Sequence, residues 1–394
     1  MRDDAKINAA AELLTELFAF KQPADNVVNL YFRSRRYIGS KDRRFIADAV
    51  WAVLRRFGRY SEMSRPLTPR VALALYLKET GRDPALFFTG GQYAPLPLTK
   101  DEDIPFVAVP ETAECPDWLR GRIDDDDIRA MTGEATLDLR VNTLKADRDD
   151  VLRELAEYGA VATAYSPVGV RLNKRISLAT LPAYREGRVE VQDEGSQIVA
   201  LLSGAKPSDT VVDWCAGAGG KTLALSSLMN ARGTIYAIDA DARRLKDLPD
   251  RARRAGAANV VVLSDYAFVK PADLVLVDAP CTGTGTWRRA PDARWRMTAE
   301  QGARICAVQA DILNKASARV KKGGALFYIT CSLDRRENED QIDAFLAGHD
   351  EFALVDLSAD LKRLTNLSAE GKTVRLSPSK TGTDGFFAAK LVRL

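Results

Sequence analysis

Histidine and clustered cysteine are nearly missing from this sequence. Its 394 residues contain one histidine, His349, and five cysteines, none of which belongs to a Cys-x-x-Cys pair. A zinc site needs Cys and His ligands at short spacing, so no metal is expected. A single histidine also argues against Ser-His-Asp hydrolysis. An enzyme of this composition would work with cysteine, aspartate or lysine side chains.

Long apolar segments are missing as well. No stretch approaches the ~20 apolar residues that a membrane span needs. The N-terminus lacks the basic, apolar and small-residue pattern of a signal peptide. The apolar fraction of 46% is that of a globular protein. We therefore expect a cytoplasmic monomer that makes no contact with a membrane.

The length predicts more than one domain. Apolar residues at three- to four-residue spacing predict helices over about 5–20, 27–37, 42–58 and 69–80, the third with Ser40 as N-cap. From Val191 onward, strands alternate with helices, as in a parallel sheet with crossover helices. The predicted division is an all-helical domain over 1–89, a connector over 90–129, an α+β module over 130–190 and a doubly wound α/β domain over 191–394.

Positive charge is concentrated between Arg33 and Arg59, where nine Lys or Arg residues face two Asp residues. Aromatic residues such as Tyr37 and Trp51 lie among them. Arg and Lys neutralise phosphates and aromatic rings stack on unpaired bases, so this segment predicts RNA contact. The alternative is a solvated helix face over a core into which Trp51 and its apolar neighbours point.

Three short apolar segments lead directly into loops with reactive residues. These segments end at Cys215, Asp278 and Ile329, and the loops carry a glycine run, Cys281 and Cys331. Runs rich in Val, Ile and Leu predict buried parallel strands. Ligands of open α/β sheets bind at the carboxyl ends of the strands, so the three loops are expected to meet at one crevice.

The glycine run has three possible interpretations. A dinucleotide fingerprint fails because Thr222 stands where a third glycine is needed. A phosphate-binding loop fits Gly220, Lys221 and Thr222, but Cys215 occupies its first glycine position, and Asp278 could imitate its magnesium-binding partner. A loop for S-adenosylmethionine is favoured by Asp239 and Asp265, which end the next two predicted strands and could hold the ribose hydroxyls and the adenine amine.

Cys281 and Cys331 stand in polar loops, whereas Cys115 and Cys306 are expected to be buried small apolar residues. A methyl donor beside a thiol suggests cytosine C5 chemistry. A thiolate that adds to C6 makes C5 nucleophilic enough to attack a sulfonium methyl group. A carboxyl group near N3 would stabilise the adduct.

The chain resembles the Sun/RsmB family of RNA (cytosine-5) methyltransferases. The resemblance is carried by seven ordered stretches: Arg140–Lys145, Val191–Gln197, Asp213–Thr222, Asp278–Gly285, Arg288–Asp292, Tyr328–Leu333 with Glu337–Glu339, and Gly382–Phe387. It implies a Rossmann-like class I methyltransferase domain, a small RNA-binding α+β module and an N-terminal NusB-like domain. Many relatives have a proline where this glycine loop has Ala218.

The family resemblance implies a role for each matching residue. Cys331 would be the nucleophile, Cys281 would assist product release and Asp278 would contact the cytosine edge. The residues expected to hold S-adenosylmethionine are Cys215, Ala216, Gly217, Ala218, Gly219, Gly220, Lys221, Asp239, Asp265, Asp278 and Pro280.

The resulting hypothesis is an S-adenosylmethionine-dependent methyltransferase that modifies C5 of a cytosine in 16S ribosomal RNA through a covalent cysteine–C6 adduct. Transfer RNA is the alternative substrate. An RNA-dependent ATPase with a phosphate-binding loop and a non-catalytic RNA assembly factor are the alternative functions.

Overall fold

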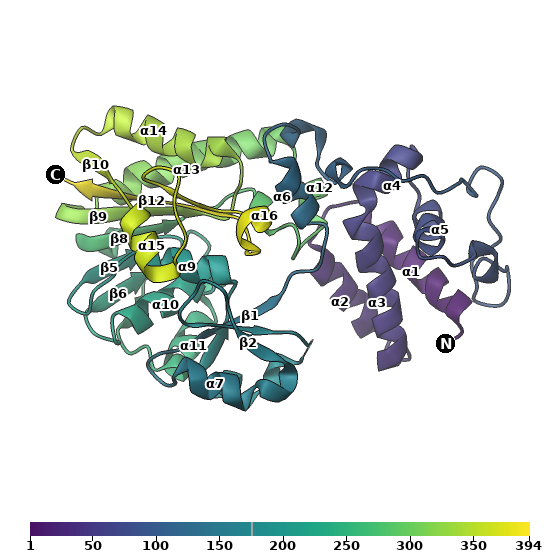
Figure 1. The fold of residues 1–394 in the computed structure, drawn as a ribbon, viewed down its shortest axis with the longest axis horizontal. Coiled ribbons are helices and arrows are strands. Elements are labelled where there is room, and N and C mark those ends of the chain that lie inside the picture. Colours follow the sequence, from purple (N-terminus) through teal and green to yellow (C-terminus); the bar gives the residue numbers. More distant parts are fainter. Residues whose placement is uncertain (175) are drawn as a thin grey trace. The chain divides into compact units, whose positions relative to one another are not determined.

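The computed structural model describes residues 1–174 and 176–394 (Figure 1). Packing divides them into two compact units. The first consists of residues 1–134 and 286–299, and the second of residues 135–285 and 300–394. The sequence analysis predicted four segments with their own boundaries, and that finer division stays a prediction.

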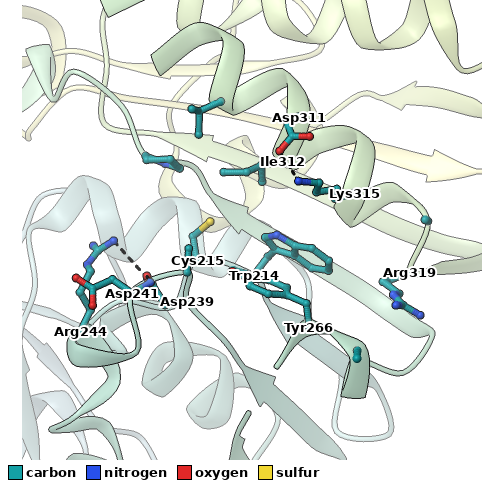
Figure 2. Close-up of a pocket in the computed structure, with 15 residues that line it drawn as sticks. Trp214, Cys215, Asp239, Asp241, Arg244, Tyr266, Asp311, Ile312, Lys315 and Arg319 are labelled. Atoms are coloured by element: carbon teal, nitrogen blue, oxygen red, sulfur yellow. Dashed lines mark hydrogen bonds and ion pairs between the residues drawn. The ribbon is translucent and has the colours of Figure 1, made fainter. Parts of the chain in front are cut away.

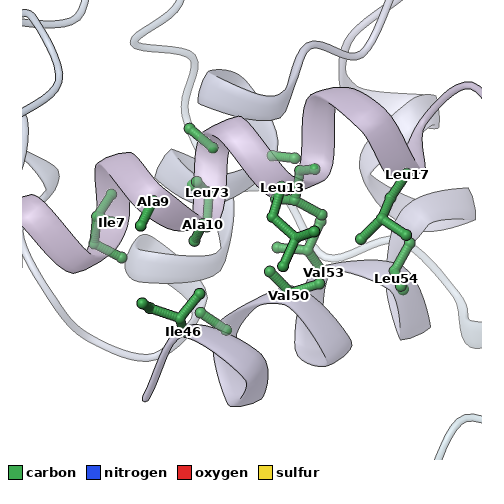
Figure 3. Close-up of a cluster of buried hydrophobic side chains, with 14 of the residues drawn as sticks. Ile7, Ala9, Ala10, Leu13, Leu17, Ile46, Val50, Val53, Leu54 and Leu73 are labelled. Carbon is green, nitrogen blue, oxygen red and sulfur yellow. The ribbon is translucent and has the colours of Figure 1, made fainter. Parts of the chain in front are cut away.

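The first unit is helical. Leu13, Val50 and Leu54 are fully buried in its core, together with Ile7 and other apolar residues at helical spacing (Figure 3). All four predicted helices are present, but Ser40 is not an N-cap: it is the first helical residue, and Gly39 takes the N-cap position without a side-chain hydrogen bond. The helices are α1 (Asp3–Leu17), α2 (Ala24–Ser34), α3 (Ser40–Arg55), α4 (Phe57–Met63), α5 (Pro69–Glu79), α6 (Asp125–Ala130) and α12 (Ala293–Arg296).

Residues 286–299 pack within the first unit although they follow the Pro280-Cys281 loop in sequence. The rings of Phe57 and Trp295 lie 5.2 Å apart between centroids. Buried Arg294 donates a hydrogen bond of 2.7 Å to the carbonyl oxygen of Glu114. The sequence places this segment inside the predicted domain 191–394, but its packing partners lie in the N-terminal helices.

The second unit contains two sheets. The small antiparallel sheet has the order β2-β3-β1-β4, built from β1 (Leu137–Val141), β2 (Ala160–Ala162), β3 (Gly169–Leu172) and β4 (Val189–Val191). The large sheet has eight strands in the order β10-β12-β9-β8-β5-β6-β7, with β11 paired to β12. Its strands are β5 (Thr210–Asp213), β6 (Thr234–Ala237), β7 (Val260–Val262), β8 (Ala272–Asp278), β9 (Val320–Thr330), β10 (Phe352–Val355), β11 (Val374–Leu376) and β12 (Phe386–Arg393).

Helices cover both faces of the large sheet (Figure 1). Successive strand residues point to opposite faces, so Val211 packs against α9 and α10 while Val212 packs toward α13 and α14. This is the doubly wound arrangement that the sequence predicts. The helices of this unit are α7 (Arg148–Glu154), α8 (Pro182–Arg185), α9 (Glu194–Leu202), α10 (Gly220–Leu228), α11 (Leu248–Ala255), α13 (Ala299–Ser317), α14 (Glu339–Gly348), α15 (Ser358–Thr365) and α16 (Pro378–Thr381).

The strand order reverses beside β5. From β5 the chain proceeds to β6 and β7 on one side, then returns to β8 and β9 on the other, all in parallel. The last three strands are antiparallel additions that the sequence analysis did not predict. The loops after β5, β6, β8 and β9 therefore emerge at one edge of the sheet, on both sides of the point where ligands bind in this fold class.

No helix in the described residues has the length and apolarity to cross a membrane.

Candidate active site

Lys221 and Asp278 form an ion pair where the strand order reverses. The Nζ atom of Lys221 lies 2.7 Å from Oδ2 of Asp278 and 5.3 Å from the ring centroid of Phe386. Burial by itself would lower the pKa of Lys221, but the charge and the hydrogen bond of Asp278 outweigh it, so the pKa is raised. Lys221 therefore stays protonated, and the loop after β5 is fixed to the end of β8.

Cys281 and Cys331 face each other from the next two loops. Their Sγ atoms lie 3.3 Å apart, although the residues are separated by 50 positions in sequence. The hydrogen bond with Cys331 and burial both raise the pKa of the Cys281 thiol. The charge of Cys331 also contributes to the raised pKa of Lys221, so the ion pair and the thiols belong to one site.

The glycine loop needs glycine at two positions. Gly217 and Gly219 have φ angles of +52° and +86°, which L-residues with a Cβ atom rarely adopt. A Cβ atom on Gly219 would lie 2.2 Å from Cδ1 of Leu248. At Gly220 no atom of the described residues lies within 4 Å of the added Cβ atom, so this position is open to a ligand. Gly219 is the N-cap of α10, whose N-terminus favours negative charge.

The carboxylate of Asp239 holds the glycine loop in place, and residues 215–221 of this loop are called the glycine cradle below. Its Oδ2 accepts a hydrogen bond of 2.9 Å from the backbone N–H of Gly217, and its Oδ1 accepts one of 2.9 Å from Asp241. Arg244 forms an ion pair with this carboxylate at 3.3 Å (Figure 2). Its guanidinium also lies 3.0 Å from where a Cβ atom on Gly217 would be. Asp239 thus holds the loop next to the cavity that it lines, and its contact with a ribose stays a prediction.

Asp265 lies differently from what its predicted role suggests. It is exposed, and its Oδ1 accepts a hydrogen bond of 2.8 Å from the N–H of Ala267. The residues that follow it, Tyr266 and Ala267, line the adjoining cavity, whereas Asp265 is not among the lining residues. Its contact with an adenine amine stays a prediction.

A cavity of about 970 Å³ lies next to the cradle. Figure 2 shows Trp214 and Tyr266 side by side in it, with ring centroids 4.8 Å apart, while Ile312 enters from α13. Of the predicted cofactor residues, Cys215, Asp239 and Pro280 line this cavity. The others, Ala216, Gly217, Ala218, Gly219, Gly220, Lys221, Asp265 and Asp278, are not among its lining residues.

The sequence analysis missed the aromatic wall of this cavity and Arg244. Trp214 and Tyr266 each stand within four residues of a strand end, and this position is the signal that could have identified them. Cys215 also contributes to the wall, and burial raises the pKa of its thiol well above the usual range. Cys215 therefore has the character of a packing residue rather than a nucleophile.

Asp213 lies at the end of β5, beneath the cradle, and is completely buried. Its Oδ2 accepts a hydrogen bond of 2.7 Å from Oγ1 of Thr222, whereas Oδ1 has no hydrogen-bond partner in the part of the chain that the structure describes. Burial raises its pKa to about 7, the hydrogen bond from Thr222 opposes the shift, and the negative charge of Asp278 adds to it. This environment therefore favours the protonated form of Asp213 below about pH 7.

Comparison with known proteins identifies the family. The family model for 16S rRNA methyltransferase RsmB/F matches residues 200–392, and the ferredoxin-like domain model of the same family matches residues 116–179. A probable ribosomal RNA small subunit methyltransferase B from Synechocystis is 34% identical over 303 residues, which cover 72% of this chain and 68% of that protein. The chain belongs to the RsmB/F methyltransferase family.

A second relative and a solved structure are also similar to this chain. The probable ribosomal RNA small subunit methyltransferase B of Bacillus subtilis is 34% identical over 268 residues, 64% of this chain and 59% of that protein. The chain thus spans about two thirds or less of the length of these relatives. The crystal structure of PH0851 has 27% identity and a TM-score of 0.79, and the alignment covers 100% of this chain and 99% of that one.

The structure of NSun6 from Pyrococcus horikoshii with SFG shares the fold, with a TM-score of 0.62 at 21% identity over 71% of this chain and 98% of that one. RsmB/F proteins use S-adenosylmethionine as methyl donor. The residues of this chain fit that group: a glycine cradle at a helix N-terminus, a carboxylate at the end of β6 and an aromatic cavity beside them. This decides among the three interpretations of the glycine loop.

Proposed function

We propose that this protein transfers a methyl group from S-adenosylmethionine to C5 of a cytosine in RNA, with 16S ribosomal RNA as substrate. The observation that carries this proposal is the pair of thiols, 3.3 Å apart, on the two loops next to the Lys221–Asp278 pair. A single thiol would suffice for the formation of an adduct. The second thiol, at contact distance from the first, suggests that release of the methylated base from the adduct is also assisted.

In this proposal Cys331 is the nucleophile. Its sulfur forms a bond to C6 of the cytosine, and the electron pair of the C5–C6 double bond moves onto the ring. C5 would then be electron-rich enough to accept the methyl group that S-adenosylmethionine supplies, and the S–CH₃ bond of the sulfonium would break to leave a neutral thioether. Loss of the C5 proton restores the double bond and breaks the bond between sulfur and C6.

Asp278 is placed to hold the cytosine edge. The ion pair with Lys221 fixes its position, and its side chain is still 33% exposed, so one face is open to a base. A carboxyl group at N3 and the exocyclic amine stabilises the negative charge that the ring gains when sulfur adds. Lys221 acts through Asp278 by fixing the position of its carboxyl group.

Cys281 lies beside the adduct in this proposal. Its raised pKa keeps it as a neutral thiol in the resting protein, so it does not compete with Cys331 as the nucleophile. Once Cys331 is bonded to C6, its sulfur no longer raises the pKa of Cys281 through a hydrogen bond or a charge. It can then assist removal of the C5 proton and release of the product.

The names of the relatives support ribosomal RNA as the substrate. The basic segment of the first unit supports RNA contact, because Arg36, Lys41, Arg44 and Tyr37 are exposed there. Trp51 and Phe45 instead pack against the core, as the alternative interpretation expected. A base must leave its stack to reach the thiols, so a loop or a partly assembled RNA suits this site better than a duplex.

Bisulfite sequencing of total RNA from cells with and without the gene tests the proposal. One cytosine of 16S RNA should lose its protection in the cells that lack the gene. Lost protection in transfer RNA instead would correct the substrate. Unchanged protection at every position would favour the non-catalytic assembly factor.

A further inference from the structure

A buried carboxylate lies behind the two thiols. Glu337 belongs to the 3-10 turn Arg335–Glu337 and is 1% exposed. Within the described residues it forms no ion pair with a lysine or arginine. Burial of a carboxylate without a cation is costly unless hydrogen bonds satisfy its oxygens.

Four donors satisfy this carboxylate, and three of them belong to the residues directly after the cysteines. Oε2 accepts a hydrogen bond of 2.8 Å from the N–H of Thr282 and one of 3.0 Å from Nε2 of Gln309. Oε1 accepts one of 2.5 Å from Oγ of Ser332 and another from Oγ1 of Thr282. Thr282 follows Cys281, and Ser332 follows Cys331.

Further hydrogen bonds also connect the Cys281 loop with the Cys331 loop. Oγ of Ser332 lies 3.0 Å from Oγ1 of Thr284, which accepts a hydrogen bond of 2.7 Å from the N–H of Leu333. The N–H of Gly285 donates to the carbonyl oxygen of Cys331 at 3.0 Å. Gln309 also donates to the carbonyl oxygen of Pro280 at 2.9 Å. The two thiol loops are therefore joined to each other, and Glu337 is where most of these bonds meet.

We propose that Glu337 is a positioning residue whose buried carboxylate fixes the Cys281 and Cys331 loops so that their thiols face each other. The consequence for catalysis rests on the proposed function of these thiols. Four hydrogen bonds meet on this one buried carboxyl group, and three of them come from Thr282 and Ser332, so Glu337 can hold both loops against thermal motion. It touches neither sulfur atom through its own hydrogen bonds, and it acts through Thr282 and Ser332.

The test uses Glu337→Gln. The amide keeps the size of the carboxylate but has one accepting oxygen, so its NH₂ group would face donors. Glu339→Gln is the matched control, because Glu339 carries the same substitution two residues away and pairs with Arg375 instead. Thr282→Val removes one of the four hydrogen bonds in a smaller perturbation.

The first readout needs no RNA and no cofactor. Diamide, a diazene oxidant, takes one hydrogen from each of two adjacent thiols onto its N=N bond as the S–S bond forms. The full-length protein is treated with diamide and then digested, and the Cys281–Cys331 disulfide is measured by peptide mass mapping. We expect the disulfide to form about tenfold more slowly in Glu337→Gln and more slowly, by a smaller factor, in Thr282→Val, with Glu339→Gln equal to the wild type.

The second readout is methylation. Glu337→Gln should lower kcat while the KM values for RNA and S-adenosylmethionine stay near those of the wild type, a split that general loss of structure would not give. Wild-type rates of disulfide formation in folded Glu337→Gln, or in Thr282→Val if the first variant does not fold, would overturn the proposal. If the wild type shows no methylation, the proposed function fails, whereas the diamide result still decides the role of Glu337.

Discussion

The Nζ atom of Lys221 lies 2.7 Å from Oδ2 of Asp278, and this pair joins the glycine cradle to the strand that leads to Cys281. One residue comes from the cofactor loop and the other from the loop proposed to hold the base. In the proposed mechanism, the ion pair links the position of the methyl donor to that of the methyl acceptor.

Lys221→Met should lower the rate of methyl transfer by loosening the position of Asp278. Methionine removes the charge and leaves Asp278 without its partner, so the cytosine edge is held less accurately. A small misplacement of reacting groups can lower kcat by up to about 100-fold. Single-turnover methylation measures this rate, with exposed Lys372→Met as control. A change confined to cofactor affinity, with an unchanged rate, would contradict this role for Lys221.

Tyr266→Ala should weaken cofactor binding. Tyr266 lies against Trp214 in the cavity and donates a hydrogen bond of 3.2 Å to the carbonyl oxygen of Trp214. Stacking of a base on an aromatic ring contributes about 1–3 kcal/mol, so the dissociation constant of S-adenosylmethionine should rise about tenfold or more. Calorimetry measures it. Phe268→Ala is the control, because Phe268 is 65% exposed in the same turn and does not line the cavity. Equal effects of the two changes would contradict the prediction.

Asp213 predicts a dependence of stability on pH. Its pKa is about 7 in the folded protein and 3.8 in a model peptide. Between these values the folded protein holds a proton that the unfolded chain has released. The free energy of unfolding therefore decreases as pH rises through this window and levels off above about pH 7.

The Asp213→Asn variant should lose this dependence. Between pH 5 and pH 8 it should gain roughly 2–3 kcal/mol of stability relative to the wild type, because the wild type loses about 1.4 kcal/mol per pH unit as the pH rises from 5 to 7. Urea denaturation at the two pH values measures the difference, and exposed Asp350→Asn is the control. An equal loss of stability in wild type and Asp213→Asn would show that another group titrates.

The basic segment should contribute to RNA affinity through its charges. Arg36 and Arg44 are exposed, so their replacement by alanine should weaken binding of every RNA sequence to a similar extent. The slope of log K against log salt should fall by about 0.7–0.9 per lost phosphate contact. Exposed Lys362 and Arg363 provide the control pair. An unchanged slope would mean that this face does not contact RNA.

The sequence predicted the loops that carry the site residues better than it predicted the side chains that line the cavity. The loops with Lys221, Cys281 and Cys331 could be placed together because parallel strands end at a common edge of the sheet. The aromatic wall of Trp214 and Tyr266, with Ile312 opposite, needed the packing of α13, which is a long-range contact.

Long-range packing also explains what the sequence did not predict elsewhere. Strand β12 pairs antiparallel with β9 and β10, which are distant in sequence, and short apolar segments do not specify such pairing. Trp295 packs among N-terminal helices for the same reason. The N-cap prediction at Ser40 was wrong because Gly39 takes that position without a side-chain bond.

The most direct test of the thiol chemistry is mass spectrometry of the covalent complex formed by Cys281→Ala with RNA and S-adenosylmethionine. With release impaired, the adduct should accumulate as a band that resists denaturant. After digestion, the peptide that contains Cys331 should carry a methylated cytidine, and Cys281→Ala combined with Cys331→Ala should give no adduct. An adduct on another residue, or methyl transfer by Cys331→Ala alone, would contradict the assignment of Cys331 as nucleophile.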